Sequence, residues 1–329
     1  MRSKNMEITA SEMSALWDSY INQTHNVCVL KYFASKAEDT DLQNILNTAL
    51  QKETVLVDKG LDFLKKEGVP IPIGFTDRDV NEQAPRLFSD TFAFLHLKHL
   101  ASAKLSITSL YFANATKKEI RTYFKQMYED TTEVLEVVRD VMLEKGIYRR
   151  HPTIDPQKSD VIENKDYLSG NYFFQEDRYL NSIEISHVAS NVQANTVGQA
   201  LTKGYSQTAD LKDVREYMKK ANDLAGKVIV TLTDYLQKSD LSAPMGSGTE
   251  VYNTTEAPFS DRLMMYQMSV LTSAGITDYA TSLATSMKSD LMKTYLDFLT
   301  DTSKLANKGA KLMIENHWLE QPPQQEKIE

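Results

Sequence analysis

Two stretches of this 329-residue chain are copies of each other, and the duplication constrains the fold more than any other feature. The sequence APRLFSD at 84–90 returns as APFSD at 257–261, and the copies then continue without a gap. Between Phe88–Pro152 and Phe259–Pro323, 13 of 65 positions are identical, where ordinary composition gives about four by chance. Because a solenoid unit has only about 20–50 residues, copies of this length predict two tandem domains.

Each repeat carries the signals of four helices, and neither shows the alternation or the hairpin turns of strands. Capping boxes at Thr9–Glu12 and Thr116–Glu119 are typical of helix starts, and Pro85 suits a first turn. Gly68, after two lysines, indicates a helix end. The expected helices cover about 11–37, 41–67, 85–113 and 116–146 in the first repeat, and 182–206, 210–239, 258–286 and 288–317 in the second.

The connections between these helices predict the topology. The first and second helices of each repeat are joined by a few residues, as are the third and fourth, so each pair forms an antiparallel hairpin. About 18 residues separate the two hairpins, which is enough to cross a bundle. We therefore expect an all-α chain of two tandem ferritin-like four-helix bundles: 9–152, a linker at 153–180, 181–320, and a flexible tail at 321–329.

Charge and composition exclude several classes of partner. The net charge of −8 and the absence of a basic run argue against nucleic acid and against a polybasic membrane anchor. The first residues contain no apolar segment of the kind found in secretion signals. The single cysteine, Cys28, fits a reducing compartment. These features predict a soluble cytoplasmic protein that binds neither nucleic acid nor membrane.

Two helices of the second repeat contain unusually long uncharged segments. No charged residue lies between Glu184 and Lys203, or between Arg262 and Asp278. An ordinary bundle helix has a charged outer face, so we expect segments 185–202 and 263–277 to be covered on two sides, within the chain or by a second copy. A methionine-lined groove for a small apolar ligand is the alternative.

A ferritin-like bundle raises the question of a di-iron centre. Such a centre needs a Glu from two helices and a Glu-x-x-His motif from each of the other two. The chain contains one such motif, Glu184-Ile185-Ser186-His187, at a helix start and without partners. We interpret Glu184 as a helix-start carboxylate beside a packed histidine.

A simpler metal site in the first repeat remains open. His25, Glu53 and His99 lie near the middle of their helices, so a bundle would place them at one level, where they could bind zinc or one iron. Helical phase places His99 inward and His96 outward. His99 aligns with Val270 of the second repeat, which favours an ordinary core position instead. We expect no cofactor, with iron or zinc as the alternative.

Nucleophilic catalysis has little support in the sequence. Cys28 lies among apolar residues with no adjacent cation, which is typical of a buried, unreactive thiol. The chain contains no nucleophile elbow, P-loop or dinucleotide fingerprint. No catalytic residue is therefore assigned, and the sequence leans toward a protein that is not an enzyme.

Four segments carry a family resemblance: VLKYFASKAEDTDLQ, GVPIPIGFTDRDVNEQAPRLFSDTF, APFSDRLMMYQ and MIENHWLEQPPQ. Over about residues 8–324 the chain resembles a domain-of-unknown-function family of tandem ferritin-like proteins from spore-forming bacilli, distantly related to the spore coat protein F group. The resemblance implies a fold and a lineage. It implies no activity, cofactor or functional residue.

Two functional hypotheses follow. The first is a non-enzymatic structural or interaction protein, associated with sporulation or stress, with a second copy or spore-coat proteins as partners. The second is a metal-binding protein or oxidoreductase with a degenerate ferritin-like site around His25, Glu53 and His99.

Overall fold

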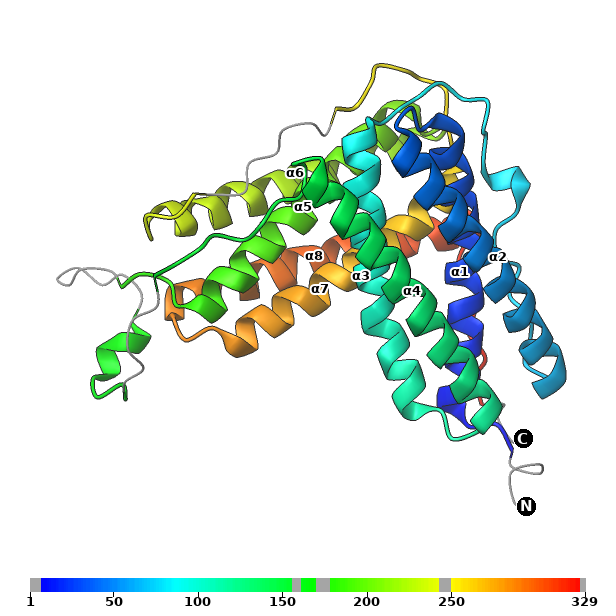
Figure 1. The fold of residues 1–329 in the computed structure, drawn as a ribbon, viewed down its shortest axis with the longest axis horizontal. Coiled ribbons are helices and arrows are strands. Elements are labelled where there is room, and N and C mark those ends of the chain that lie inside the picture. The colour runs from blue at the N-terminus through cyan, green and yellow to red at the C-terminus, as the bar shows by residue number, and fades with distance from the viewer. Residues whose placement is uncertain (1–6, 156–160, 170–177, 243–249, 326–329) are drawn as a thin grey trace. The chain divides into compact units, whose positions relative to one another are not determined.

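The computed structural model describes residues 7–155, 161–169, 178–242 and 250–325, and within them the chain is helical, with no β-strand (Figure 1). The α-helices are α1 (Ala10–Lys36), α2 (Thr40–Glu67), α3 (Asp90–Asn114), α4 (Lys118–Glu144), α5 (Ser182–Thr208), α6 (Lys212–Gln237), α7 (Asp261–Thr285) and α8 (Ser289–Glu315). Two short 3-10 helices, η1 (Asp77–Asp79) and η2 (Lys165–Leu168), lie in the connections.

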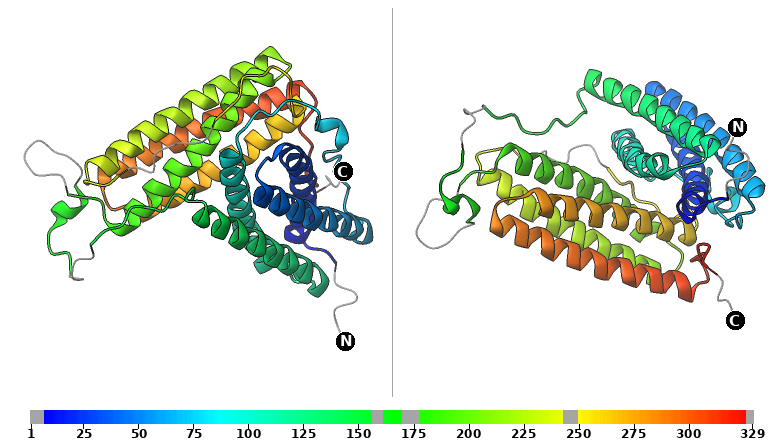
Figure 2. Two further views of the ribbon diagram at one scale, coloured as in Figure 1. Left: turned by 45° about the horizontal axis from the view of Figure 1, so that its top comes forward. Right: turned by 90° about the horizontal axis from the view of Figure 1, so that it is seen from below.

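The helices form two tandem four-helix bundles, as the duplication predicts. In the first, α1 packs on α2, α3 on α4, and further contacts join α2 to α4 and α1 to α3. In the second, α5 packs on α6, and one apolar core joins side chains of all four helices, among them Val192, Val228, Tyr279 and Phe298. Both bundles have a long connection between their second and third helices, seen in Figure 2.

The helix ends show which local signals were interpreted correctly. The capping box of Thr9 and Glu12 forms, and Gly68 ends α2 with a left-handed φ of 68°, so both predictions are confirmed. The predicted start of α3 at Pro85 is wrong, because Ser89 is the N-cap and the chain before it is extended. The hydroxyl of Tyr32 holds that extended segment, accepting from the Leu87 N–H and donating to the Pro85 carbonyl, both at 2.9 Å.

The chain divides into two compact units that do not follow the repeat boundaries in every segment. One unit contains residues up to Tyr148 together with Thr254–Met264 and Met313–Glu329, and the other contains Arg149–Asn253 and Met265–Leu312. In the first unit, Val80 of the α2–α3 connection forms an antiparallel bridge with Phe259. The boundaries at 9–152 and 181–320 therefore remain a prediction about which segments fold independently.

The duplicated APFSD signature forms part of the packed interior. Phe88 and Phe259 are each only 3% exposed. Phe88 stacks on Phe92 with ring centroids 4.4 Å apart, and Phe259 meets the ring of Tyr32 edge-on at 5.1 Å. The carboxylate of Asp90, in the first turn of α3, accepts from the Asp39 backbone N–H at 2.8 Å and so ties α3 to the start of α2.

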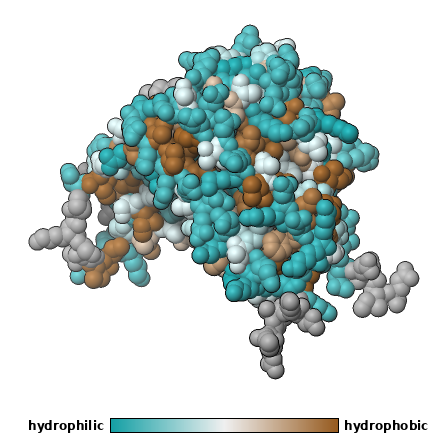
Figure 3. Space-filling view, turned by 45° about the vertical axis from the view of Figure 1, so that its right-hand side comes forward, coloured by the Kyte–Doolittle hydropathy of each residue, from teal (hydrophilic) through white to brown (hydrophobic). Residues whose placement is uncertain are grey.

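The uncharged segments of the second repeat have little exposed surface. Between Asn191 and Thr202 every residue is buried or half-buried, and Val192 belongs to the apolar core. Met264, Met265 and Met268 of α7 are also buried. On the face shown in Figure 3 most of the surface is hydrophilic, and apolar side chains lie in small groups. Among the described helices, none combines the length and the apolar character needed to cross a bilayer.

Candidate functional site

The three metal candidates lie on separate helices of the first bundle. His25 of α1 is buried, and its ring meets Phe75 edge-on at 6.0 Å. The Nδ1 atom of His25 lies 3.2 Å from the side-chain oxygen of Asn26. Glu53 of α2 and His99 of α3 are half-buried. In the part of the chain that the structure describes, no three His, Cys, Asp or Glu side chains are grouped to hold a metal ion.

His96 is the more deeply buried of the two histidines of α3, being 1% exposed, whereas His99 is half-buried. The ring of His96 stacks on that of Phe92, one turn earlier, with centroids 5.5 Å apart and an interplanar angle of 13°. Burial, with smaller effects of His99 and His25, lowers the pKa of His96 to about 3, so its ring is neutral near pH 7. The predicted outward orientation of His96 is wrong because His96 lies one turn after Phe92 and so shares the buried face of α3 with it.

The carboxylate of Glu53 is engaged by a lysine. Lys104 of α3 forms an ion pair with Glu53, and the two side chains are only 13% and 12% exposed. A second pair joins Lys52 of α2 to Asp130 of α4 at 2.9 Å. All four side chains line a cavity of about 40 Å³ between the helices. Opposite charges thus compensate each other at this level of the first bundle.

In the second bundle uncharged residues replace the histidines and Lys104, but Asp130 has the counterpart Asp301, which pairs with Lys227 at 2.9 Å. Helices of equal length in the two repeats align His25 with Val197, and the ungapped copy aligns His96 with Gln267 and Lys104 with Gly275. Gln267 is buried and accepts a hydrogen bond from the hydroxyl of Tyr205. Most buried polar side chains of this bundle are hydroxyls and amides, and its buried charges Glu184, Asp261 and Lys288 lie at helix starts.

A second group of polar contacts recurs in both bundles, and in the first bundle it is centred on Glu12. This carboxylate is 1% exposed and accepts from the backbone N–H groups of Thr9, Thr116 and Lys117 at 3.0, 2.8 and 2.7 Å. Burial alone would raise the pKa of Glu12, but the hydrogen bonds, led by those from Lys117 and Thr9, lower it to about 2. The carboxylate therefore caps α1 and the start of α4 together.

This contact corrects the predicted capping box at Thr116. The N-cap of α4 is Lys117, and its side chain makes no capping bond. The Thr116 hydroxyl instead donates to Glu12 at 3.0 Å. Because Glu12 accepts from the N–H groups at the start of α4, the residues of α4 need not supply their own cap.

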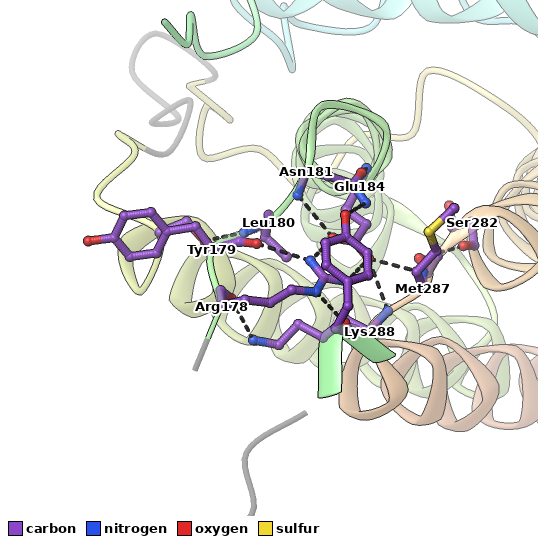
Figure 4. Close-up of polar contacts among 11 residues, drawn as sticks. Arg178, Tyr179, Leu180, Asn181, Glu184, Ser282, Met287 and Lys288 are labelled. Atoms are coloured by element: carbon purple, nitrogen blue, oxygen red, sulfur yellow. Dashed lines mark hydrogen bonds and ion pairs between the residues drawn. The ribbon is translucent and has the colours of Figure 1, made fainter. Parts of the chain in front are cut away.

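Glu184 occupies the equivalent place in the second bundle (Figure 4). It is fully buried, forms a capping box with Asn181, and accepts from the backbone N–H groups of Met287 and Lys288, both at 3.0 Å. The interpretation of Glu184 as a helix-start carboxylate is confirmed. We call Glu12 and Glu184, with the helix starts that they join, the glutamate clamps.

The clamp of the second bundle has an additional arginine. Arg178 binds the Glu184 carboxylate through two parallel bonds of 2.8 Å. Its guanidinium lies 4.2 Å from the ring centroid of Tyr167, whose backbone carbonyl accepts from Nε at 2.6 Å. Burial would raise the pKa of Glu184, but Arg178 and the backbone N–H groups lower it. Arg178 thereby attaches η2 to the start of α5.

Cys28 has the inert setting that its sequence neighbours predict. The thiol is 1% exposed, and its sulfur lies 3.4 Å from the Thr76 carbonyl. Burial, followed by the charge of Asp79, raises the pKa of the thiol to about 12. The thiol is therefore protonated near neutral pH and is a poor nucleophile.

Comparison with known proteins places the chain in a family. The model of the family described as "Protein of unknown function (DUF3231)" matches residues 1–159 and again 169–329. The chain belongs to this family. The two matches coincide with the internal duplication, so each repeat is one copy of the family's unit.

A solved structure is similar to part of the chain. It is that of a "putative spore coat protein" from Bacillus halodurans C-125, with 15% identity and a TM-score of 0.43, covering 46% of this chain and 98% of that one. No curated protein matches the chain.

Within this family member, both repeats retain the glutamate clamp, and both also have a Lys–Asp pair between their second and fourth helices, Lys52–Asp130 and Lys227–Asp301. The sequence signals for the clamp were the match of Glu12 to Glu184 and the identity of Lys117 with Lys288, although neither indicated a contact between helix starts. Because the clamp joins backbone N–H groups and leaves no acceptor open to solvent, its chemistry is that of helix capping.

Proposed function

We propose that this family member is a non-catalytic structural or interaction protein whose two bundles are ferritin-like in topology and use their buried charges to stabilise the fold. The observation that carries the proposal is the charge pairing in the first bundle. Glu53 is bound by Lys104, and Asp130 is bound by Lys52. The metal centre of the alternative hypothesis would need the Glu53 carboxylate as a ligand, and the ammonium group of Lys104 competes for it.

The glutamate clamps support the same proposal. Glu12 and Glu184 are buried glutamates, the residue type that ligates iron in ferritin-type centres. Both carboxylates instead accept hydrogen bonds from helix-start N–H groups. Such hydrogen bonds to a charged acceptor are each worth about 1.5–3 kcal/mol. These carboxylates therefore stabilise the helix starts at the ends of the bundles.

The ferritin-like topology rests on the long connections, from Glu67 to Asp90 and from Gln237 to Asp261. The proposed spore association rests on the family resemblance of the sequence motifs. On this proposal the chain is a cytoplasmic protein that associates with the spore, and its partners are coat proteins or further copies of itself.

Metal analysis of untagged protein tests the proposal. Protein grown in medium with iron and zinc should contain far less than one metal ion per chain by mass spectrometry. The control is the variant Lys104→Gln, which removes the charge and leaves a polar side chain that is one atom shorter. Near-stoichiometric iron or zinc in the wild type, lost in a His25→Ala variant, would refute the proposal and establish the metal-binding hypothesis.

Localisation is a separate test of the spore association. A fluorescent fusion expressed from its own promoter should concentrate around the forespore during sporulation. A uniform cytoplasmic signal throughout sporulation would refute the spore association. The structural role would still be tested separately by the metal analysis.

A further inference from the structure

A carboxylate-binding site lies in the α2–α3 connection. The backbone N–H groups of Ile73 and Gly74 point at one carboxylate, that of Glu320, with N···O distances of 2.6 and 3.1 Å. Successive backbone N–H groups that converge in this way form an anion-binding nest. Glu320 comes from the segment after α8, and all these residues lie within one compact unit.

Arg262 completes the site and is held there by other groups. Its guanidinium donates to the Glu320 carboxylate at 2.9 Å and to the Gly74 carbonyl at 2.8 Å. The guanidinium lies 4.5 Å from the ring centroid of Phe75, and Asp79 is 3.9 Å away. Because these contacts do not involve Glu320, Arg262 keeps its position when the carboxylate leaves.

The loop itself is also fixed independently of its ligand. Gly74 has a left-handed φ of 62°, and a Cβ there would lie 2.9 Å from the hydroxyl of Thr24. That hydroxyl accepts from the Phe75 N–H at 3.1 Å and anchors the loop to α1. Glycine is therefore required at this position, and the two N–H groups are aimed before a carboxylate arrives.

The segment that supplies Glu320 follows a turn at the end of α8. After α8 the chain turns at His317, with φ of 59°, and the Trp318 N–H bonds the Met313 carbonyl at 2.8 Å. Leu319 is exposed, and a Gln-Pro-Pro sequence follows Glu320. The Glu320 carboxylate joins this segment to the loop at Ile73 and Gly74, and its side chain is 15% exposed.

We propose that the nest at Ile73, Gly74 and Arg262 is a receptor for a glutamate side chain, and that the C-terminal segments of two copies exchange their Glu320 carboxylates between these receptors. The contact made between copies would be the same as the contact made within one copy, so exchange costs little beyond the loss of proximity. Within one chain, the tether gives the Glu320 segment an effective concentration at its own receptor in the millimolar range. Densely packed copies present the same segment at a comparable concentration. This inference rests on the proposed structural role.

A complementation experiment tests the exchange. Glu320→Gln leaves the receptor intact without its ligand, and Arg262→Gln leaves the ligand with a weakened receptor. Mixed at concentrations up to about 1 mM, the two variants should form a 1:1 heterodimer in sedimentation runs, at concentrations where each alone does not. The matched control replaces Arg262→Gln by the double variant Arg262→Gln/Glu320→Gln, which should not pair.

A peptide measurement keeps the test decisive if Arg262→Gln folds poorly. A synthetic peptide of residues 316–325 should bind the Glu320→Gln protein at least about tenfold more tightly than it binds wild type, whose receptor is occupied. A peptide with Gln in place of Glu320 should lose that binding. The exchange is refuted if the mixture sediments as the sum of its components. The receptor is refuted if the peptide binds the Glu320→Gln protein and the wild type with equal affinity. Neither result depends on metal content, so failure here is distinct from failure of the proposed function.

Discussion

The two bundles share a backbone plan and differ at their centres. The first contains the ion pairs Lys104–Glu53 and Lys52–Asp130 and three histidines, two of them deeply buried. The second has Val197, Gln267, Val270 and Gly275 in place of those histidines and Lys104, and Asp301 in place of Asp130. At its centre it has uncharged contacts, such as that between Asn191 and Ser282 at 2.9 Å.

What both bundles keep is the glutamate clamp at their ends. A buried carboxylate joins two helix starts in each, with distances that agree within about 0.3 Å. The comparison teaches that the helix-end contact defines this fold, whereas the centre tolerates either paired charges or neutral groups. The following predictions test each side of that difference, from the largest expected effect to the smallest.

Truncation of the duplicated phenylalanines should have the largest effect. Phe88→Ala and Phe259→Ala should each lower the free energy of unfolding by about 3–5 kcal/mol, because both rings are buried. Phe259 lies with the first compact unit although it belongs to the second repeat, so its loss should expose amides of α1 in hydrogen exchange. A change below about 1 kcal/mol for either variant would show that its site repacks or is accessible.

Loss of a clamp carboxylate should come next. Glu12→Gln and Glu184→Gln should each cost about 1.5–3 kcal/mol in urea unfolding, because a neutral amide accepts weaker bonds from the helix-start N–H groups. Glu184→Gln should cost more, since it also leaves Arg178 without its carboxylate. Equal, negligible costs would mean that backbone contacts alone fix the helix starts.

The clamp also predicts a pH dependence. The pKa of Glu12 is about 2 in the folded chain and 4.5 otherwise, so its stabilisation is complete above pH 4.5 and is lost as the pH falls toward 2. The Glu12→Gln variant should lose less stability than wild type over that interval. Parallel curves for the two proteins would contradict the lowered pKa.

His96 should give the first bundle an acid sensitivity that begins at a higher pH than that of the clamp and that Gln267, its counterpart in the second bundle, cannot give. Its pKa is about 3 when folded and 6.5 otherwise, so unfolding takes up a proton below pH 6.5 and stability falls as the pH drops. His96→Gln, which installs the residue of the second repeat, should flatten the stability curve between pH 6.5 and 4. An unchanged slope would show that His96 does not titrate on unfolding.

Exposed ion pairs should contribute least. Lys227 pairs with Asp301 at 2.9 Å, but its side chain is 58% exposed. Lys227→Ala should change the free energy of unfolding by less than about 1 kcal/mol, in contrast to Lys104 in the first bundle. A loss comparable to that of a Lys104 variant would mean that surface charge also supports the second bundle.

The sequence predicted much of the fold because its signals are local. Helix periodicity, the box at Thr9 and the glycine at Gly68 depend on neighbours within one or two turns. The start of α3 was missed because Tyr32, more than fifty positions away, holds residues 85–87 extended. The orientation of His96 was missed because positions 96 and 99 both lie within about 40° of Phe92 around the helix axis, so helical phase alone does not separate them.

The candidate sites were harder to predict, since they depend on contacts distant in sequence. Glu12 reaches the start of α4, and Glu53 is bound by Lys104, yet nothing near either carboxylate in the sequence indicates its partner. The metal hypothesis around His25, Glu53 and His99 remains a prediction for metal analysis.

The central claim, that charges at the centre of the first bundle compensate each other, is tested most directly by a double-mutant cycle on Glu53 and Lys104. Lys104→Met alone should cost about 3–5 kcal/mol, because it leaves a mostly buried carboxylate without its partner. The double variant Glu53→Leu/Lys104→Met should unfold within about 1 kcal/mol of wild type, as a neutral centre like that of the second bundle would. If the costs of the two single variants instead add in the double variant, the two charges do not compensate each other, and the account is contradicted.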